Sequence, residues 1–166
     1  AACTGAKFLD KARMPDSDDG LLFFATTREG HGLHFQRKPY TAVFYILACL
    51  EFAAAIKARR AEGQDVGGFD AAVFVEKGRD MFERFRVWID DPKAFGRTPP
   101  PPGAKLASSL AHVMCLAGLA EEFIETIPEE RALYMPFVED AMRRVRLHFD
   151  PTRKIFMEVV DPERGV

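Results

Sequence analysis

The stretch Gln36-Arg37-Lys38-Pro39-Tyr40-Thr41-Ala42-Val43-Phe44-Tyr45-Ile46-Leu47-Ala48-Cys49-Leu50-Glu51-Phe52 decides how the rest of the chain is interpreted. Polar residues and a proline open it, and the residues that follow are apolar for most of four helical turns. Proline suits the first turn of a helix, because its missing N–H needs no partner there. A helix that is apolar nearly all round is buried on every side. We therefore expect a buried helix from Tyr40 to about Arg60. The side chains of Gln36 and Arg37 are expected at the opening of the buried region, where a polar ligand could bind.

Composition places the chain among ordinary globular proteins. Its 166 residues are enough for one domain with a core, and 48% of them are hydrophobic and 29% charged. The net charge of -2 gives no electrostatic reason to expect a nucleic acid or an anionic membrane as a partner. We expect that no apolar run approaches membrane-spanning length, and no signal-peptide pattern opens the chain.

Cysteine and histidine spacing gives no sign of a metal or cofactor. Cys3, Cys49 and Cys115 are odd in number, widely spaced and set in apolar helical contexts, which is typical of buried, reduced thiols in a cytoplasmic protein. No Cys/His pair has zinc-site spacing and no glycine loop resembles a phosphate cradle. His31 and His34, three residues apart on an extended chain, are expected to point to opposite faces.

Both ends of the chain are expected to be cut. The first residues form the inside of a helix pattern without a capping residue, and the last ones form a turn followed by the start of a strand. We interpret residues 1–166 as a single incomplete domain segment of a longer protein.

Two kinds of helix alternate along the chain. Residues 40–60 and 105–125 are apolar almost all round, which predicts inner helices. Pro128 is expected to end the second of them. Residues 1–14, 70–90 and 129–149 have one polar face, which predicts outer helices. A loop is expected over residues 15–20, a hairpin over 21–36 and a strand over 154–160. This alternation favours an all-α arc of an (α/α) toroid with short β-hairpins at its rim. In the last helix we expect these residues to face inward: Leu133, Phe137, Val138, Ala141, Met142, Val145 and Phe149.

The order of several short motifs resembles the central part of the N-acylglucosamine 2-epimerase (renin-binding protein) family. The motifs are Phe24-Ala25-Thr26-Thr27-Arg28-Glu29-Gly30, the strand ending in Gln36-Arg37, the helix 40–52, the helix 69–90, Phe95-Gly96-Arg97, the helix from Leu106, and Ile155-Phe156-Met157-Glu158-Val159-Val160. They cover nearly the whole chain, which would form the middle third to two-fifths of a full-length member.

The resemblance implies a partial (α/α)6 barrel, a homodimer and an isomerase of carbohydrate metabolism. Members interconvert N-acetylglucosamine and N-acetylmannosamine, and relatives act on mannose-type sugars and cellobiose. The chemistry is proton transfer at the carbon next to the carbonyl of the opened sugar, which suits a pair of histidines. The family's two acid–base histidines lie downstream of this chain and an arginine contact lies upstream. No catalytic residue is therefore expected within these residues.

The sequence departs from the family pattern at two positions. Ala42 stands where many members have an acidic residue, so the identity of the sugar substrate is left open. Leu106 stands where related isomerases carry a histidine near the start of an inner helix. The second departure favours epimerase chemistry over aldose–ketose isomerisation.

Arg37 is the first candidate for binding a sugar, because a guanidinium can donate a fork of hydrogen bonds to hydroxyls or a carbonyl. Gln36 and Tyr40 are its candidate partners. The alternatives stay open: Arg37 could bond loop carbonyls at the rim, and Tyr40 could lie at the edge of the core. His112 could reach the pocket or be a satisfied core histidine, and Glu158 could line the rim or be solvated.

His148 and the arginines that precede it have a simpler interpretation. His148 falls in a last helical turn, where a cation is favoured. Arg143, Arg144 and Arg146 are expected to form a solvated outer face.

Two other classes of function remain as alternatives. A glycoside hydrolase-like toroid needs two pocket carboxylates about 5–10 Å apart. The carboxylates that the expected inner helices offer, such as Glu51, Glu121 and Glu122, are far from the helix starts. A non-catalytic helical interaction module would have no polar set at the starts of its inner helices.

Overall fold

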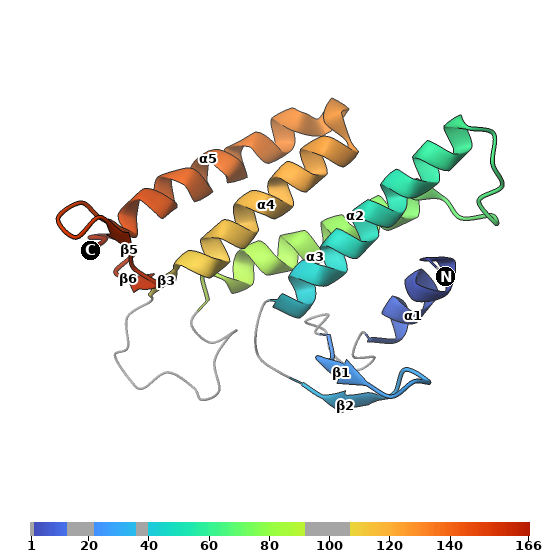
Figure 1. The fold of residues 1–166 in the computed structure, drawn as a ribbon, viewed down its shortest axis with the longest axis horizontal. Coiled ribbons are helices and arrows are strands. Elements are labelled where there is room, and N and C mark those ends of the chain that lie inside the picture. Colours follow the sequence, from blue (N-terminus) through green and yellow to red (C-terminus); the bar gives the residue numbers. More distant parts are fainter. Residues whose placement is uncertain (1, 13–21, 36–39, 92–106) are drawn as a thin grey trace. The chain divides into compact units, whose positions relative to one another are not determined.

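The computed structural model describes residues 2–12, 22–35, 40–91 and 107–166 (Figure 1). These residues are mostly helical, which confirms the all-α class. The chain divides into two compact units, Ala1–Phe85 and Arg86–Val166, and the division falls inside one helix. We describe each unit by itself.

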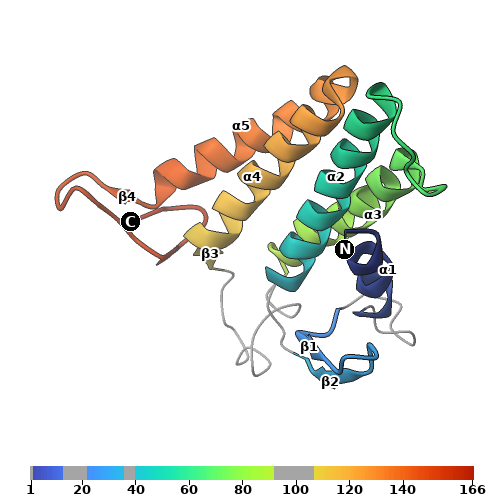
Figure 2. The same ribbon diagram turned by 45° about the vertical axis from the view of Figure 1, so that its right-hand side comes forward.

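The described residues of unit 1 form three α-helices and a hairpin (Figure 2). Helix α1 spans Ala2–Leu9 and continues as a 3-10 turn, η1, over Asp10–Ala12. Strands β1 (Ala25–Thr26) and β2 (Gly32–His34) are antiparallel, with an irregularity between the two residues of β1. Helix α2 spans Tyr40–Ala61, and α3 spans Ala71–Trp88 and runs into unit 2. The helices and the hairpin predicted for this part of the chain are confirmed; the predicted loop at residues 15–20 lies outside the described residues.

The core of unit 1 lies between α2 and α3. At Gly78 the backbone of α3 comes close to Leu50 and Cys49 of α2. A Cβ atom added at Gly78 would lie at ordinary contact distances from both side chains. Phe52 of α2 makes edge-on contacts with Phe69 and Phe74. Such aromatic pairs add to the stability already gained by burying their apolar area. The fully buried side chains of this core include Ile46, Leu50, Met81, Phe82 and Phe85.

The expectation that α2 is buried on every side is wrong. Phe44 is 69% exposed, while its neighbours Tyr45 and Ile46 are buried. The reason is geometric, because in unit 1 helices α1 and α3 cover only part of the circumference of a 22-residue helix. An apolar sequence shows that a face can be buried, but the fold decides whether another element covers it.

By length and composition alone, α2 could cross a membrane. An 18-residue window has a mean hydropathy of 1.7, and 44% of that window is buried inside the structure. The expectation that no apolar run reaches this length is therefore wrong. A core helix passes the same test, so the finding by itself does not place the chain in a membrane.

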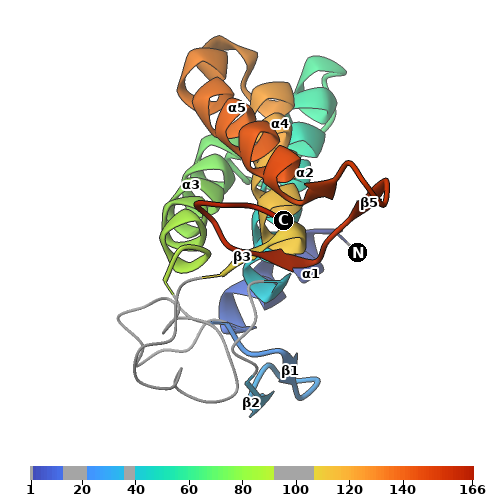
Figure 3. The same cartoon turned by 90° about the vertical axis from the view of Figure 1, so that its left-hand side faces the viewer.

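Unit 2 is built on an α-hairpin (Figures 1 and 3). Helix α4 spans Leu110–Thr126, the 3-10 turn η2 spans Pro128–Glu130, and α5 spans Arg131–Leu147. Val113, Leu116 and Leu119 of α4 are buried, and Phe123 of α4 stacks on Tyr134 of α5 with ring centroids 4.4 Å apart. Pro128 ends α4, as predicted.

Two short antiparallel ladders lie where α4 begins and α5 ends (Figure 3). Strand β3 (Ser108–Ser109) pairs with β6 (Val159–Val160). Strand β4 (Phe149–Asp150) pairs with β5 (Ile155–Phe156) across a turn in which Lys154 has a φ of 56°. The strand predicted over 154–160 is therefore two strands with different partners.

Two further expectations for unit 2 are wrong. The helix expected over 105–125 begins at Leu110, because Ser108 and Ser109 pair with β6 instead of entering the helix. Leu133 and Met142, expected to face inward, are 59% and 50% exposed, and Phe149 is 39% exposed. The buried positions of α5 are Tyr134 and Ala141. Tyr134, which stacks on Phe123, is buried in place of the expected Leu133. Ala141 is buried as expected.

Candidate functional site

The predicted sugar-binding residues are only partly described by the structure. Gln36 and Arg37 lie outside the described residues, so their role stays a prediction. Tyr40 is the first residue of α2 and is 37% exposed. Strand β2 ends at His34 and α2 begins at Tyr40, so Gln36 and Arg37 come between these two elements in the sequence.

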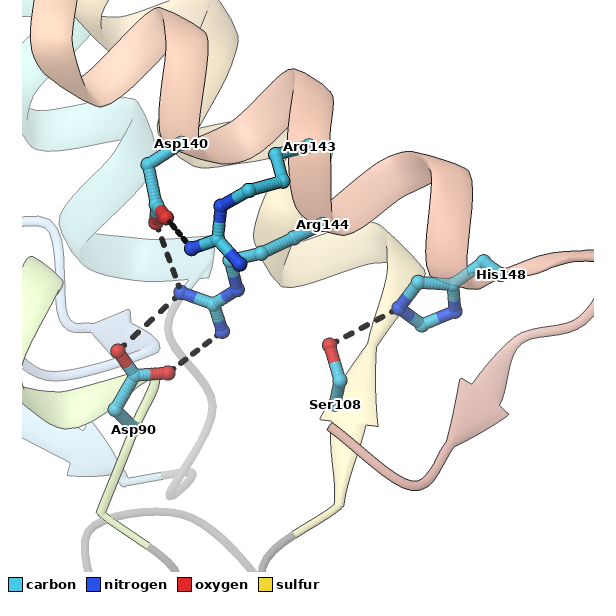
Figure 4. A network of polar contacts seen from close by, with 6 residues as sticks. All are labelled: Asp90, Ser108, Asp140, Arg143, Arg144 and His148. Atoms are coloured by element: carbon cyan, nitrogen blue, oxygen red, sulfur yellow. Dashed lines mark hydrogen bonds and ion pairs between the residues drawn. The ribbon is translucent and has the colours of Figure 1, made fainter. Parts of the chain in front are cut away.

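A second group of polar side chains surrounds the start of α4 (Figure 4). We call it the α4 cluster, and it comprises Asp90, Ser108, Ser109, His112, Asp140, Arg144, His148 and Glu158. All of these residues belong to unit 2.

His148 is the buried centre of this cluster. It caps α5, and its Nδ1 lies 2.8 Å from the carbonyl oxygen of Met157. A carbonyl can only accept, so Nδ1 donates. In the neutral imidazole Nε2 is then an acceptor, and it lies 3.0 Å from Oγ of Ser108, which donates to it. The backbone N–H of Met157 donates to the carbonyl of His148 at 2.8 Å. We call this set of bonds the His148 clasp.

The clasp corrects the interpretation of His148 as a surface cation. His148 is 0% exposed and Ser108 is 4% exposed. A serine and a histidine at this distance also occur in nucleophilic catalysis. Here, however, burial of the Ser108 hydroxyl keeps it away from a substrate. The clasp therefore joins three segments, namely the end of α5, Met157 between β5 and β6, and the start of β3.

The clasp also determines the position of Glu158, because it fixes the neighbouring residue, Met157. The carbonyl of Glu158 accepts from the backbone N–H of Leu110 at 2.8 Å. Its carboxylate accepts from Oγ of Ser109 at 3.4 Å. These two bonds hold the exposed carboxylate beside the first turn of α4.

His112 is the third residue of α4 and is half-buried. Burial lowers its pKa below the ordinary value of 6.5, and the positive charge of Arg144 lowers it further. The negative charges of Glu158 and Asp90 act in the opposite direction on the same pKa. The net direction is downward, so His112 is a neutral imidazole at neutral pH and can act as both donor and acceptor.

Arg144 is held by a paired contact that the sequence does not reveal. Its two terminal nitrogens lie 2.6 and 3.2 Å from the carboxylate of Asp90, in the fork geometry that strengthens such pairs. Asp140, one turn earlier on α5, lies 3.7 Å away and also binds Arg143. The side chain of Arg144 is only 14% exposed. The expectation of a solvated arginine face is therefore wrong for Arg144, while Arg143 and Arg146 are exposed as expected.

No group of three His, Cys, Asp or Glu side chains that could hold a metal occurs in the part of the chain that the structure describes. His31 and His34 are both exposed, and His34 lies edge-on to the ring of Phe24.

The chain matches no protein-family model and no curated protein. Sequence reasoning missed the His148 clasp. The one available signal was the pair of serines directly before an apolar helix.

Proposed function

We propose that this chain is part of a cytoplasmic, homodimeric sugar 2-epimerase with an (α/α)6 barrel, acting on N-acetylglucosamine and N-acetylmannosamine or a related aldose. The observation that carries the proposal is the order of motifs along the sequence, from the rim hairpin through Gln36-Arg37 to an apolar helix, and on to the strand that contains Glu158. Two structural features support it. The hairpin directly precedes α2, and a second short ladder lies at the start of α4.

In this proposal the chain supplies one wall of the sugar site. Arg37 donates hydrogen bonds to the carbonyl or hydroxyls of the opened sugar, with Gln36 and Tyr40 beside it. The two histidines that remove and return the proton at carbon 2 belong to residues outside this chain. The chain alone is therefore expected to be inactive.

The position of His112 adds a second candidate function. Epimerase chemistry is favoured over isomerase chemistry only if Leu106 stands near the start of an inner helix. Helix α4 begins at Leu110, so the histidine in its first turn is His112. A neutral imidazole there suits proton transfer as well as binding. This single observation favours aldose–ketose isomerisation of a mannose-type sugar as the alternative activity.

One experiment separates these activities. The longer protein that contains this chain is incubated in heavy water with N-acetylmannosamine, and in parallel with mannose, and the products are followed by NMR. An epimerase gives the carbon-2 epimer of the supplied sugar, deuterated at carbon 2. An isomerase converts mannose to the ketose. If neither deuterium exchange nor a product is observed, both proposals are refuted. Hydrolysis of a disaccharide would favour the glycoside hydrolase alternative.

The role of Arg37 is tested in the same assay. Arg37→Ala is expected to lower kcat/KM by about tenfold or more, because it removes charge-assisted bonds to the substrate. Arg59→Ala, at the exposed end of α2, is the matched control and should leave kcat/KM unchanged. Equal values for both variants would contradict the assignment of Arg37.

A further inference from the structure

Helix α1 and the turn of the β1–β2 hairpin enclose a hollow of about 360 Å³ in unit 1. Figures 1 and 2 show α1 next to this hairpin. The residues that line the hollow are Cys3, Thr4, Lys7, Phe8, Lys11 and Arg28. Three of them are cations and none is an acid. Unit 1 therefore concentrates positive charge in a concave surface, although the whole chain is slightly acidic.

Contacts inside unit 1 hold two of these cations in place without neutralising them. The ammonium of Lys11 donates to the carbonyl oxygen of Glu29 at 3.2 Å. The stem of Lys11 lies against Gly30, where a Cβ atom would come within 2.6 Å of the lysine Cδ. Gly30 also has a φ of +96°, which L side chains rarely adopt. The turn therefore needs a glycine here, and this glycine gives Lys11 its place across the turn.

Lys7 is held by an aromatic ring. Its ammonium lies 5.5 Å from the ring centroid of Phe69, within the range of a cation–π contact. The nearby Asp10 is already engaged, because both of its carboxylate oxygens lie 2.8 Å from the ammonium of Lys77. Within the described residues of unit 1, no carboxylate forms an ion pair with Lys7, Lys11 or Arg28. Glu29, next to Arg28 in the turn, is not among the lining residues.

We propose that this hollow binds the phosphoryl group of a small phosphate monoester. Two lysines supply positive charge and Arg28 supplies a planar fork that matches phosphate oxygens. The hydroxyl of Thr4 adds a donor, and the ring of Phe8 offers an apolar surface to the organic part of the ester. The inference does not rest on the proposed sugar chemistry, because none of these residues belongs to the proposed sugar site.

Calorimetry on the full chain at low ionic strength tests the proposal, with inorganic phosphate, glucose 6-phosphate and glucose as probes. Phosphate and the monoester should bind and glucose should not. Lys7→Gln combined with Lys11→Gln should weaken binding about tenfold or more, because it removes two charge-assisted contacts. The control, Lys57→Gln combined with Arg59→Gln, removes the same charge from the exposed end of α2 and should leave binding nearly unchanged.

Several results would overturn the proposal. The proposal fails if the unmodified chain does not bind phosphate. It also fails if both double variants weaken phosphate binding equally, because this would indicate a general electrostatic effect of the lost charges. Binding of inorganic phosphate without binding of the ester would exclude the monoester as the ligand.

Cys3 gives an independent measurement, because it is exposed and lines the hollow. A dianionic aromatic disulfide should label the Cys3 thiol by thiol–disulfide exchange, and saturating phosphate should slow that labelling severalfold. The half-buried Cys115 in unit 2 is the internal control, and its rate should not change. Peptide mass spectrometry assigns each label. An unchanged rate at Cys3 under saturating phosphate would overturn the proposal.

Discussion

Helices α2 and α4 both follow a short strand, but the two strands are held in different ways. Strand β2 pairs with its sequence neighbour β1 in an exposed hairpin, and the turn between them is closed by Thr27. Strand β3 pairs with the distant β6, and Ser108 beside it is bonded to a buried histidine. Losing a bond in the first arrangement leaves groups that water can satisfy. In the second, it leaves buried groups without a partner.

The comparison predicts that similar substitutions have very different costs in the two places. The largest effect is expected for His148→Ala. This change leaves a cavity and removes the partners of the Ser108 hydroxyl and the Met157 carbonyl, so the free energy of unfolding should fall by about 2–4 kcal/mol. The loss of unfolding free energy is measured by denaturant unfolding, with hydrogen exchange of the unit 2 amides as the method of detection.

His31→Ala is the matched control in the hairpin. The side chain is exposed, so the change should cost less than about 0.5 kcal/mol. Similar losses for the two alanine variants would show that the clasp does not stabilise unit 2 as we argue.

Ser108→Ala should have an intermediate effect. It removes one hydroxyl and leaves Nε2 of His148 as a buried acceptor without its donor, at a cost of about 1–2 kcal/mol. Ser108→Cys, which keeps a weak donor of similar size, should recover part of this loss. Full stability of Ser108→Ala in the same unfolding measurement would argue against the hydrogen bond.

A smaller and local effect is expected for Thr27→Ala. Oγ1 of Thr27 accepts from the backbone N–H groups of Glu29 and His31, each at 3.2 Å and both exposed. The loss should be about 0.5 kcal/mol and confined to the hairpin, because water can replace the oxygen. Faster hydrogen exchange at these two amides, with unchanged exchange in α2, is the expected result. Loss of protection throughout unit 1 would contradict it.

The smallest effect is expected from the titration of His112. Its pKa is lowered in the folded state, so the unfolded chain holds the proton over a range in which the folded chain does not. The free energy of unfolding should therefore rise with pH from the lowered pKa to 6.5 and be smallest below that range. His112→Asn should flatten this part of the profile while exposed His31→Asn leaves it unchanged. A slope of opposite sign would contradict burial as the cause.

Local pattern was enough to predict the helical class and most helix ranges. Periodic apolar residues placed α3 within two residues, and Pro128 marked the end of α4. The hairpin was also predictable, because Gly30 stands at a turn between two short runs of strand-forming residues.

The missed features depend on contacts between residues distant in the chain. Ser108 and Ser109 leave the helix because Val159 and Val160 pair with them. The buried face of α5 is set by Phe123 on another helix, which the sequence of α5 alone does not contain. Arg144 is drawn inward by Asp90, and His148 is buried because Ser108 and Met157 satisfy both ring nitrogens. Periodicity describes one helix at a time, so none of these could be read from it.

The His148 clasp also has a consequence for the order of folding. Ser108 and His148 are 40 residues apart, and the hairpin of α4 and α5 lies between them. The two helices can meet through contacts near their shared turn, but the start of α4 gains its partners only after the residues up to Val160 have been synthesised. Closure of such a long loop is slow compared with helix formation. On the ribosome, the end of α4 that carries His112 should therefore be the last part of unit 2 to become protected.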